Sequence, residues 1–149
     1  MGRVIANVAA IVCGASFSGL PAGWHQSRPW CTTSSNGISS GNTFTWAATP
    51  HSVDNLIRFP SSGIYIWVSL NRSTRRVSGR RLHVPLRLTD ATILQQEGRP
   101  RLPELRFEGR YQRRYDATIG VDFGRPHPSP AAWLAAQRAL NAIVWPRWP

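Results

Sequence analysis

The sequence predicts an α+β fold: an antiparallel sheet of four to six strands, with a C-terminal amphipathic helix at residues 130–145 packed on one face. Short runs of alternating or β-branched apolar residues, separated by turn-forming residues, indicate the strands. Ser129 and Pro130 begin an alanine-rich stretch with a single apolar stripe, which indicates the helix. The 149 residues are 42% hydrophobic, and a chain of this length and composition suits one domain with its own core.

Before the strongest strand, the pattern predicts a loop, a strand and a turn. Residues 32–42 are rich in Ser, Gly and Asn, which is typical of a polar loop. Residues 43–47 alternate polar and apolar side chains, as a half-buried strand does. Residues 51–56 suit a single helical turn, and the Pro and Gly of residues 59–63 predict a tight turn.

The strongest strand signal lies at residues 64–70, where nearly every side chain is β-branched or aromatic. A run this apolar predicts a central strand covered on both faces. Residues 82–88 alternate in polarity, and Pro85 among them predicts an edge strand, because proline has no N–H for a ladder. Residues 105–111 and 115–123 then predict an antiparallel hairpin with an arginine-rich end.

The chain carries a large positive charge, but its all-arginine composition makes this charge weaker evidence for a function. The net charge is +11, and all eighteen basic residues are arginine, a pattern that indicates a GC-rich genome as much as a phosphate-binding surface. The excess still favours polyanions. The candidate polyanion contacts are Arg72, Arg75, Arg76, Arg80, Arg81, Arg110, Arg113 and Arg114. The alternative interpretation of these arginines is solvated hairpin ends.

The N-terminus has the pattern of a signal peptide. A basic start precedes the apolar run 4–12, and small residues follow it, so residues 1–19 are a candidate signal or anchor segment ahead of a domain at 20–149. The alternative is a first buried strand or helix. The run is shorter than the roughly 20 apolar residues that a membrane span needs, and we expect no transmembrane helix. Cys13 and Cys31 either form one bridge in an oxidising compartment or remain free thiols.

Three stretches together resemble a group of small extracytoplasmic domains from GC-rich, actinobacterial-type genomes. They are residues 20–25, with a Gly-Trp-His sequence, residues 59–68, and residues 116–130 with the Ser-Pro helix start. The resemblance covers most of residues 20–145. It implies an extracytoplasmic location and a short β-rich domain with a closing helix, and it implies no activity, ligand or catalytic residue.

Motifs for catalysis, metals and cofactors are not found in the sequence. The histidines His25, His51, His83 and His127 are scattered without metal-ligand spacing. No phosphate-binding loop and no nucleophile elbow occurs, so we expect no cofactor and no enzymatic activity. Trp24 and His25 are adjacent and form a candidate ligand contact. Glu108 and Asp122 could face each other across the predicted hairpin, although Arg106 and Arg110 are equally placed to pair with them.

These features favour an exported domain with a non-enzymatic binding or structural role at the cell envelope. An anionic envelope polymer or lipid would be its partner. The alternative is a cytoplasmic protein that binds nucleic acid through the two arginine-rich segments, with Tyr111 and Tyr115 as stacking groups. A hydrolase that the motifs do not reveal is the third hypothesis.

Overall fold

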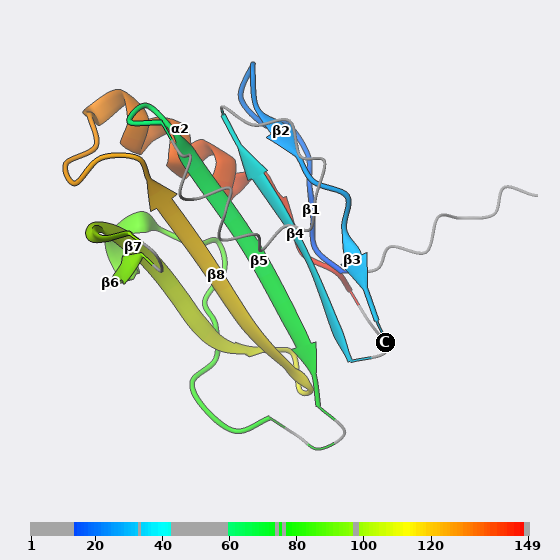
Figure 1. Ribbon diagram of the computed structural model, residues 1–149. Coiled ribbons are helices and arrows are strands. Elements are labelled where there is room, and N and C mark those ends of the chain that lie inside the picture. The colour runs from blue at the N-terminus through cyan, green and yellow to red at the C-terminus, as the bar shows by residue number, and fades with distance from the viewer. Residues whose placement is uncertain are drawn as a thin grey trace, which may run out of the picture.

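The architecture is an antiparallel sheet with a helix on one face, as the computed structural model shows (Figure 1). The structure describes residues 14–32, 34–42, 60–73, 75, 77–96 and 99–147. Its elements in order are β1 (Ser16–Phe17), β2 (His25–Gln26), β3 (Trp30–Cys31), β4 (Ser35–Gly41), β5 (Ile64–Arg72), a 3-10 turn (Leu88–Asp90), β6 (Thr92–Gln96), β7 (Arg99–Tyr111), β8 (Tyr115–Phe123), α2 (Pro130–Asn141) and β9 (Ile143–Val144).

Within the described part of the chain, the main sheet has seven strands. Their order is β2-β4-β5-β8-β7-β6, and β3 also pairs with β4. Every pair in this sheet is antiparallel. The predicted fold class is therefore confirmed, with slightly more strands than the four to six expected. A separate two-stranded sheet joins β1 to β9.

The hydrophobic core lies between the sheet and α2. Alternate side chains of the two central strands, β5 and β8, point into it, because successive residues of a strand face opposite sides. They are Ile64, Ile66, Val68, Leu70, Ala117, Ile119, Val121 and Phe123. From the helix, Ala136, Ala139 and Leu140 are buried against them. Phe123 also stacks on Trp133 of α2, with ring centroids 6.1 Å apart. The predicted position of residues 64–70 in a central strand is confirmed.

The β7–β8 hairpin has the predicted position, with Tyr111 opposite Tyr115. Gln112 takes a positive φ of 56° in the turn between them. The predicted turn at 59–63 is confirmed for the described residues 60–63, since the Gly63 N–H donates to the Pro60 carbonyl at 2.8 Å. Both features depend on local residue preferences, which the sequence shows directly.

Helix α2 begins as predicted, because the Ser129 hydroxyl accepts a hydrogen bond from the Ala132 N–H at 3.1 Å and Pro130 holds the first helical position. It ends at Asn141 rather than at 145. The next residues form β9, which pairs with β1. Ala15 and Phe17, which lie inside the segment considered as a signal or anchor, are part of the buried core.

Two predictions of local structure are wrong. Residues 32–42 were expected to form a polar loop, but β4 occupies most of them and is almost wholly buried. Its small side chains leave room for aromatic rings: Trp30 lies where a side chain on Gly37 would be. The segment 82–88 is not an edge strand. The bridge between Arg81 and Arg110 lies just before it, the Leu82 N–H donates to the Arg110 carbonyl, and the Val84–Pro85 peptide bond inside it is cis.

Several predictions fall outside the described residues. These are the apolar run 4–12 and Cys13, the strand at 43–47, the helical turn at 51–56, and Arg76. In the described chain, no helix is long and apolar enough to cross a membrane.

Candidate functional site

The fold brings the two arginine-rich segments together at one end of the sheet. The chain leaving β5 runs along the β7–β8 hairpin end. The N–H groups of Ser73 and Val77 donate to the carbonyls of Arg114 and Arg113, at 2.8 and 3.0 Å. Two further backbone hydrogen bonds join Arg110 to Arg80 and to Leu82, at 2.8 and 2.9 Å. Segments about 30 residues apart in the sequence therefore form one surface.

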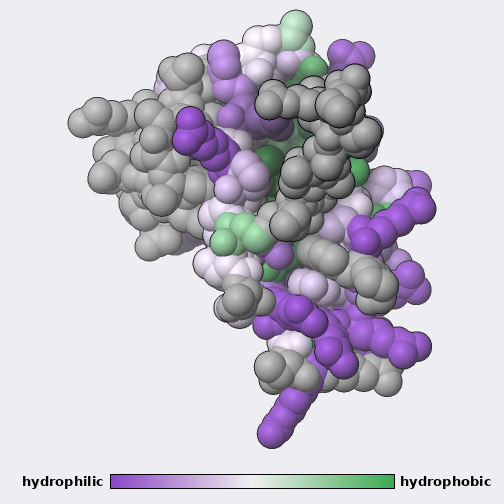
Figure 2. Space-filling view, turned by 90° about the vertical axis from the view of Figure 1, so that its right-hand side faces the viewer, coloured by the Kyte–Doolittle hydropathy of each residue, from purple (hydrophilic) through white to green (hydrophobic). Residues whose placement is uncertain are grey.

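We call this surface the basic end. Its members from the sequence-based set are Arg72, Arg75, Arg80, Arg81, Arg110, Arg113 and Arg114. All are exposed except the half-buried Arg110. Among the described residues, none of them has a carboxylate within 4.0 Å, because the ion pairs found there involve Arg106 alone. Figure 2 shows long hydrophilic side chains projecting from this lower end of the molecule. The basic end is thus an exposed cluster of guanidinium groups without neutralising partners.

Arg147, near the C-terminus, adds a charge beside the basic end that the local sequence does not predict. The Tyr111 hydroxyl donates to the Pro146 carbonyl at 2.6 Å, and the Tyr111 ring packs on Trp145. This contact brings Arg147 close enough for its charge to lower the pKa of Tyr111, against the larger opposing effect of burial. No local signal in the sequence links the C-terminal segment to the hairpin, because the contact exists only in the folded chain.

The two tyrosines expected to stack on nucleic-acid bases are used in packing. Tyr115 is buried in the hydrophobic core. Tyr111 is held by Pro146 and Trp145. A base-stacking platform needs an aromatic face open to solvent. Tyr115 is therefore closed to base stacking, and the part-buried Tyr111 is tied to the C-terminal segment.

Trp24 and His25 lie elsewhere. Trp24 is half-buried and packs against the hydrophobic core. His25 is exposed in β2, opposite Gly41 of β4. In the sheet register, Gly41 lies level with Tyr65, whereas the basic end is level with Asn71 and Arg72. The candidate ligand contact and the candidate polyanion contacts are thus at different places on the molecule.

A second cluster of charged groups lies on the face of the sheet away from α2. Asp122 of β8 is directly opposite Glu104 of β7, and Tyr65 of β5 is opposite Asp122 on the other side. The predicted pairing of Glu108 with Asp122 is wrong, because Glu108 lies opposite Thr118. The Arg106 guanidinium binds Glu104, with its Nε 2.7 Å from Oε1. It also lies 5.7 Å from the centre of the Trp67 ring.

The carboxyl of Asp122 is held neutral at physiological pH. Burial in the sheet is the largest cause, and the adjacent Glu104 carboxyl is the second; together they raise the pKa of Asp122 to about 9. The Trp67 indole and the Arg106 charge lower it by less. Glu104 and Trp67 affect the proton affinity of Asp122, although neither makes a well-aligned hydrogen bond to its oxygens. Burial likewise raises the pKa of Tyr65.

Two carboxyl groups side by side, with a proton held on one of them, are the arrangement of many acid–base catalysts. Here Glu104 is 5% exposed and Asp122 0% exposed. A substrate cannot reach a pair buried to this degree. The pair therefore acts within the fold, as part of the packing of β7 on β8, and its proton makes that packing sensitive to pH.

Other chemistry finds no support among the described residues. No three His, Cys, Asp or Glu side chains in the described ranges gather as metal ligands would. Cys31 is disulfide-bonded. The only other cysteine of the chain is Cys13, which lies outside the described residues.

Fold and surface together define a small antiparallel β-sheet protein closed by a C-terminal helix, with a cluster of arginines at one end of the sheet that have no carboxylate partner among the described residues. Comparison of the chain with protein-family models, with curated proteins and with solved structures finds no match.

Proposed function

We propose that the chain is an exported, non-enzymatic domain of the cell envelope, and that its basic end binds an anionic envelope polymer. The observation that carries the proposal is the convergence of Arg72, Arg75 and Arg80 with Arg113 and Arg114 on one exposed surface without carboxylate partners. Uncompensated guanidinium groups attract phosphate and carboxylate groups strongly and bind them with paired hydrogen bonds.

A polymer suits this surface better than a lipid bilayer or a nucleic acid. Binding at a bilayer surface is strongest where apolar side chains insert beside the charges. Among the described residues, the large apolar side chains that are exposed include none from the segments 72–75 and 110–114. Nucleic-acid binding through base stacking is disfavoured because Tyr111 and Tyr115 are engaged in packing.

Export is supported by the disulfide at Cys31, since disulfides persist mainly in oxidising compartments. We expect the natively expressed protein to be found outside the cytoplasm. After alkylation without a reductant, its intact mass should show no alkylated cysteine, and prior reduction should add the label. A cytoplasmic protein that alkylates without reduction would contradict export. The N-terminal residue, read from the same mass, should fall no later than Cys13, because Cys31 is disulfide-bonded and the sequence offers it no other cysteine.

Polymer binding should be strongly salt-dependent and should depend on the basic end. With polyphosphate as the probe, we expect the Kd to rise at least about tenfold between 50 and 200 mM NaCl, because binding releases condensed counterions. The triple variant R72A/R113A/R114A should weaken binding at 50 mM NaCl by about tenfold or more, as three phosphate contacts are lost. Fluorescence anisotropy with labelled polyphosphate measures both effects.

The matched control removes the same charge from other surfaces. Arg28, Arg101 and Arg138 are exposed, and the variant R28A/R101A/R138A lowers the net charge equally. Equal losses in the two triple variants would show that only net charge matters, and would overturn the proposal. Single-stranded DNA with the same number of charges should bind no more tightly than polyphosphate. A clear preference for DNA would favour the nucleic-acid alternative, and a clear preference for anionic vesicles would favour a lipid.

A further inference from the structure

A cleft of about 420 Å³ opens beside the basic end, between β7 and the segment 80–92. Its apolar lining consists of Leu82, Leu86 and Phe107, the three of them core residues at the edge of the sheet. The volume falls within the range of roughly 300–1,000 Å³ that is usual for small-molecule sites. Nothing in the proposed binding of a polymer along the basic end requires such a hollow.

The wall of the cleft is fixed at both ends. At one end, Leu82 donates its N–H to the Arg110 carbonyl at 2.9 Å. At the other end, Gln137 of α2 holds the wall with its side-chain amide, which donates to the Leu86 carbonyl and accepts from the Leu88 N–H, each at 2.9 Å. A wall clamped by backbone hydrogen bonds keeps its shape, so the cleft is present before any ligand arrives.

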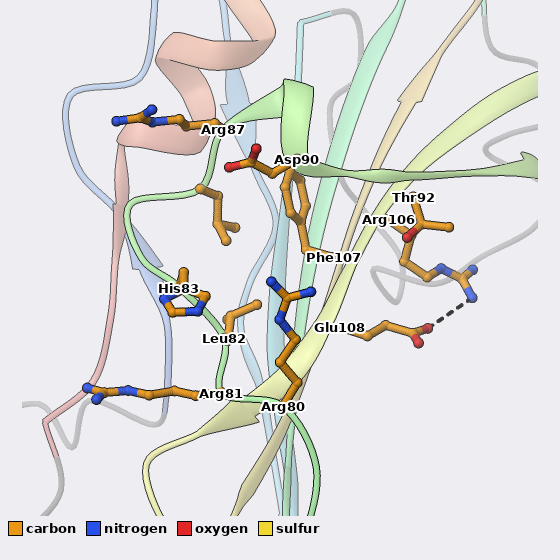
Figure 3. A pocket seen from close by; sticks show the side chains of 11 residues that line it. Arg80, Arg81, Leu82, His83, Arg87, Asp90, Thr92, Arg106, Phe107 and Glu108 are labelled. Carbon is orange, nitrogen blue, oxygen red and sulfur yellow. Dashed lines mark ion pairs between the residues drawn. The ribbon is translucent and has the colours of Figure 1, made fainter.

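The charges that line the cleft are of two kinds. Arg106 is neutralised by Glu104 and Glu108, and the second of these pairs is drawn in Figure 3. Arg80, Arg81 and Arg87 have no carboxylate within 4.0 Å in the described chain, as the ion pairs there are those of Arg106. Figure 3 shows Arg80 extending toward the space below Phe107, whereas Arg81 and Arg87 extend outward at the rim.

Asp90 supplies an acceptor at the opposite end of the same cleft from Arg80 (Figure 3). Its carboxylate has no basic group within 4.0 Å among the described residues. Thr92 adds a hydroxyl to the lining. The cleft thus offers an unpaired guanidinium donor, Arg80, at one end, an unpaired carboxylate acceptor, Asp90, at the other, and apolar carbon between them.

We propose that this cleft binds one phosphorylated sugar or polyol unit, with the phosphate on Arg80 and the hydroxyls on Asp90. A phosphate accepts paired hydrogen bonds from guanidinium groups, and sugar hydroxyls donate to carboxylates. The carbon skeleton of such a unit would cover Leu82 and Leu86. This inference deepens the proposed function and rests on it, because the bound unit is taken to be the repeat of the polymer that the basic end holds.

The arrangement disfavours simpler ligands. Inorganic phosphate held by Arg80 would leave Asp90, at the other end of the cleft, without a hydroxyl donor. An uncharged sugar would leave the arginines without an anion. A polymer segment of several units exceeds the volume, so the cleft holds one unit while the rest of the chain follows the basic end.

Isothermal titration at 100 mM NaCl tests the site with four probes: glucose 6-phosphate, glycerol 3-phosphate, inorganic phosphate and glucose. We expect one phosphorylated compound at least to bind about tenfold more tightly than inorganic phosphate, and glucose not to bind measurably. R80A should weaken the phosphorylated compound about tenfold or more. D90A should reduce its preference over inorganic phosphate to near unity, since the variant loses the acceptor for the hydroxyl groups.

The control D116N removes an exposed carboxylate outside the cleft and should change neither affinity nor preference. Equal binding of glucose 6-phosphate, glycerol 3-phosphate and inorganic phosphate to the wild type would overturn the inference, as would a preference that survives in D90A. Polyphosphate binding that persists in R80A and D90A while the small probes fail would overturn the cleft and leave the proposed function standing. Loss of polyphosphate binding only in R72A/R113A/R114A supports the proposed function independently.

Discussion

The free energy of unfolding is expected to fall as the pH rises from about 4 to about 9, because the folded chain keeps a proton on Asp122 that the unfolded chain releases. The ordinary pKa of this carboxyl is 3.8, and burial beside Glu104 raises it to about 9 in the fold. Between these values the native state binds one more proton, so each pH unit lowers stability by at most about 1.4 kcal/mol. Below about pH 4 and above about pH 9 this contribution does not change.

The variant D122N isolates the effect, because an amide resembles the protonated acid and cannot ionise. We expect the unfolding free energy of D122N to change less with pH than that of the wild type. Plots of the two free energies against pH should diverge toward pH 9, where the variant should be the more stable. Urea denaturation at pH 5, 7 and 9 provides the measurement. The control E108Q changes an exposed carboxyl on the same face of β7 and should leave the wild-type slope intact. Parallel curves for D122N and the wild type would show that Asp122 ionises normally.

The register that creates the carboxyl pair follows from the hairpin turn. With Tyr111 opposite Tyr115, each step along the strands places Asp122 opposite Glu104. The turn is predicted correctly from the sequence. The predicted start of the first hairpin strand, residue 105, is too late, because the prolines before it indicate a loop. In the structure β7 begins at Arg99 and pairs there with the edge strand β6, where proline is tolerated.

The missed strand β4 shows a different limit. Its sequence, Ser-Asn-Gly-Ile-Ser-Ser-Gly, has the composition of a loop and little β-propensity. It forms a strand because β5 pairs with it along its whole length and because its small residues admit the ring of Trp30. Such a strand is specified by its neighbours, so a pattern read along the chain does not reveal it.

The arginine-rich segments of the candidate site could be predicted from the sequence, but their contact with each other could not. Both arginine-rich segments can be read from the sequence. Their contact depends on the parallel bridge between Arg81 and Arg110, and the cleft depends on Gln137 holding Leu86 and Leu88. These contacts join residues about 30 and 50 positions apart, which neither periodicity nor motif spacing encodes.

Gly120 is expected to accept no side chain without displacing a ring on the face opposite the helix. It lies across from Trp67 in the sheet, and a Cβ at this position would overlap the Nε1 side of the Trp67 indole. G120A must therefore displace the ring, which would end its contact with the Arg106 guanidinium and withdraw the indole N–H from Asp122. We expect a loss of about 1–3 kcal/mol in the free energy of unfolding, as for other overpacked sites.

A double-mutant cycle with W67F separates this overlap from any general effect of the substitution. The smaller ring of phenylalanine leaves space for the new methyl group, so G120A should be much less destabilising in the W67F background, with a coupling of about 1 kcal/mol or more. The two effects would instead add within about 0.5 kcal/mol if the indole did not occupy the space above Gly120. Because Trp67 lowers the pKa of Asp122, G120A should also extend the pH-dependent loss of stability above pH 9. An unchanged pH profile would show that the indole does not affect the Asp122 proton, even where the packing conflict is real.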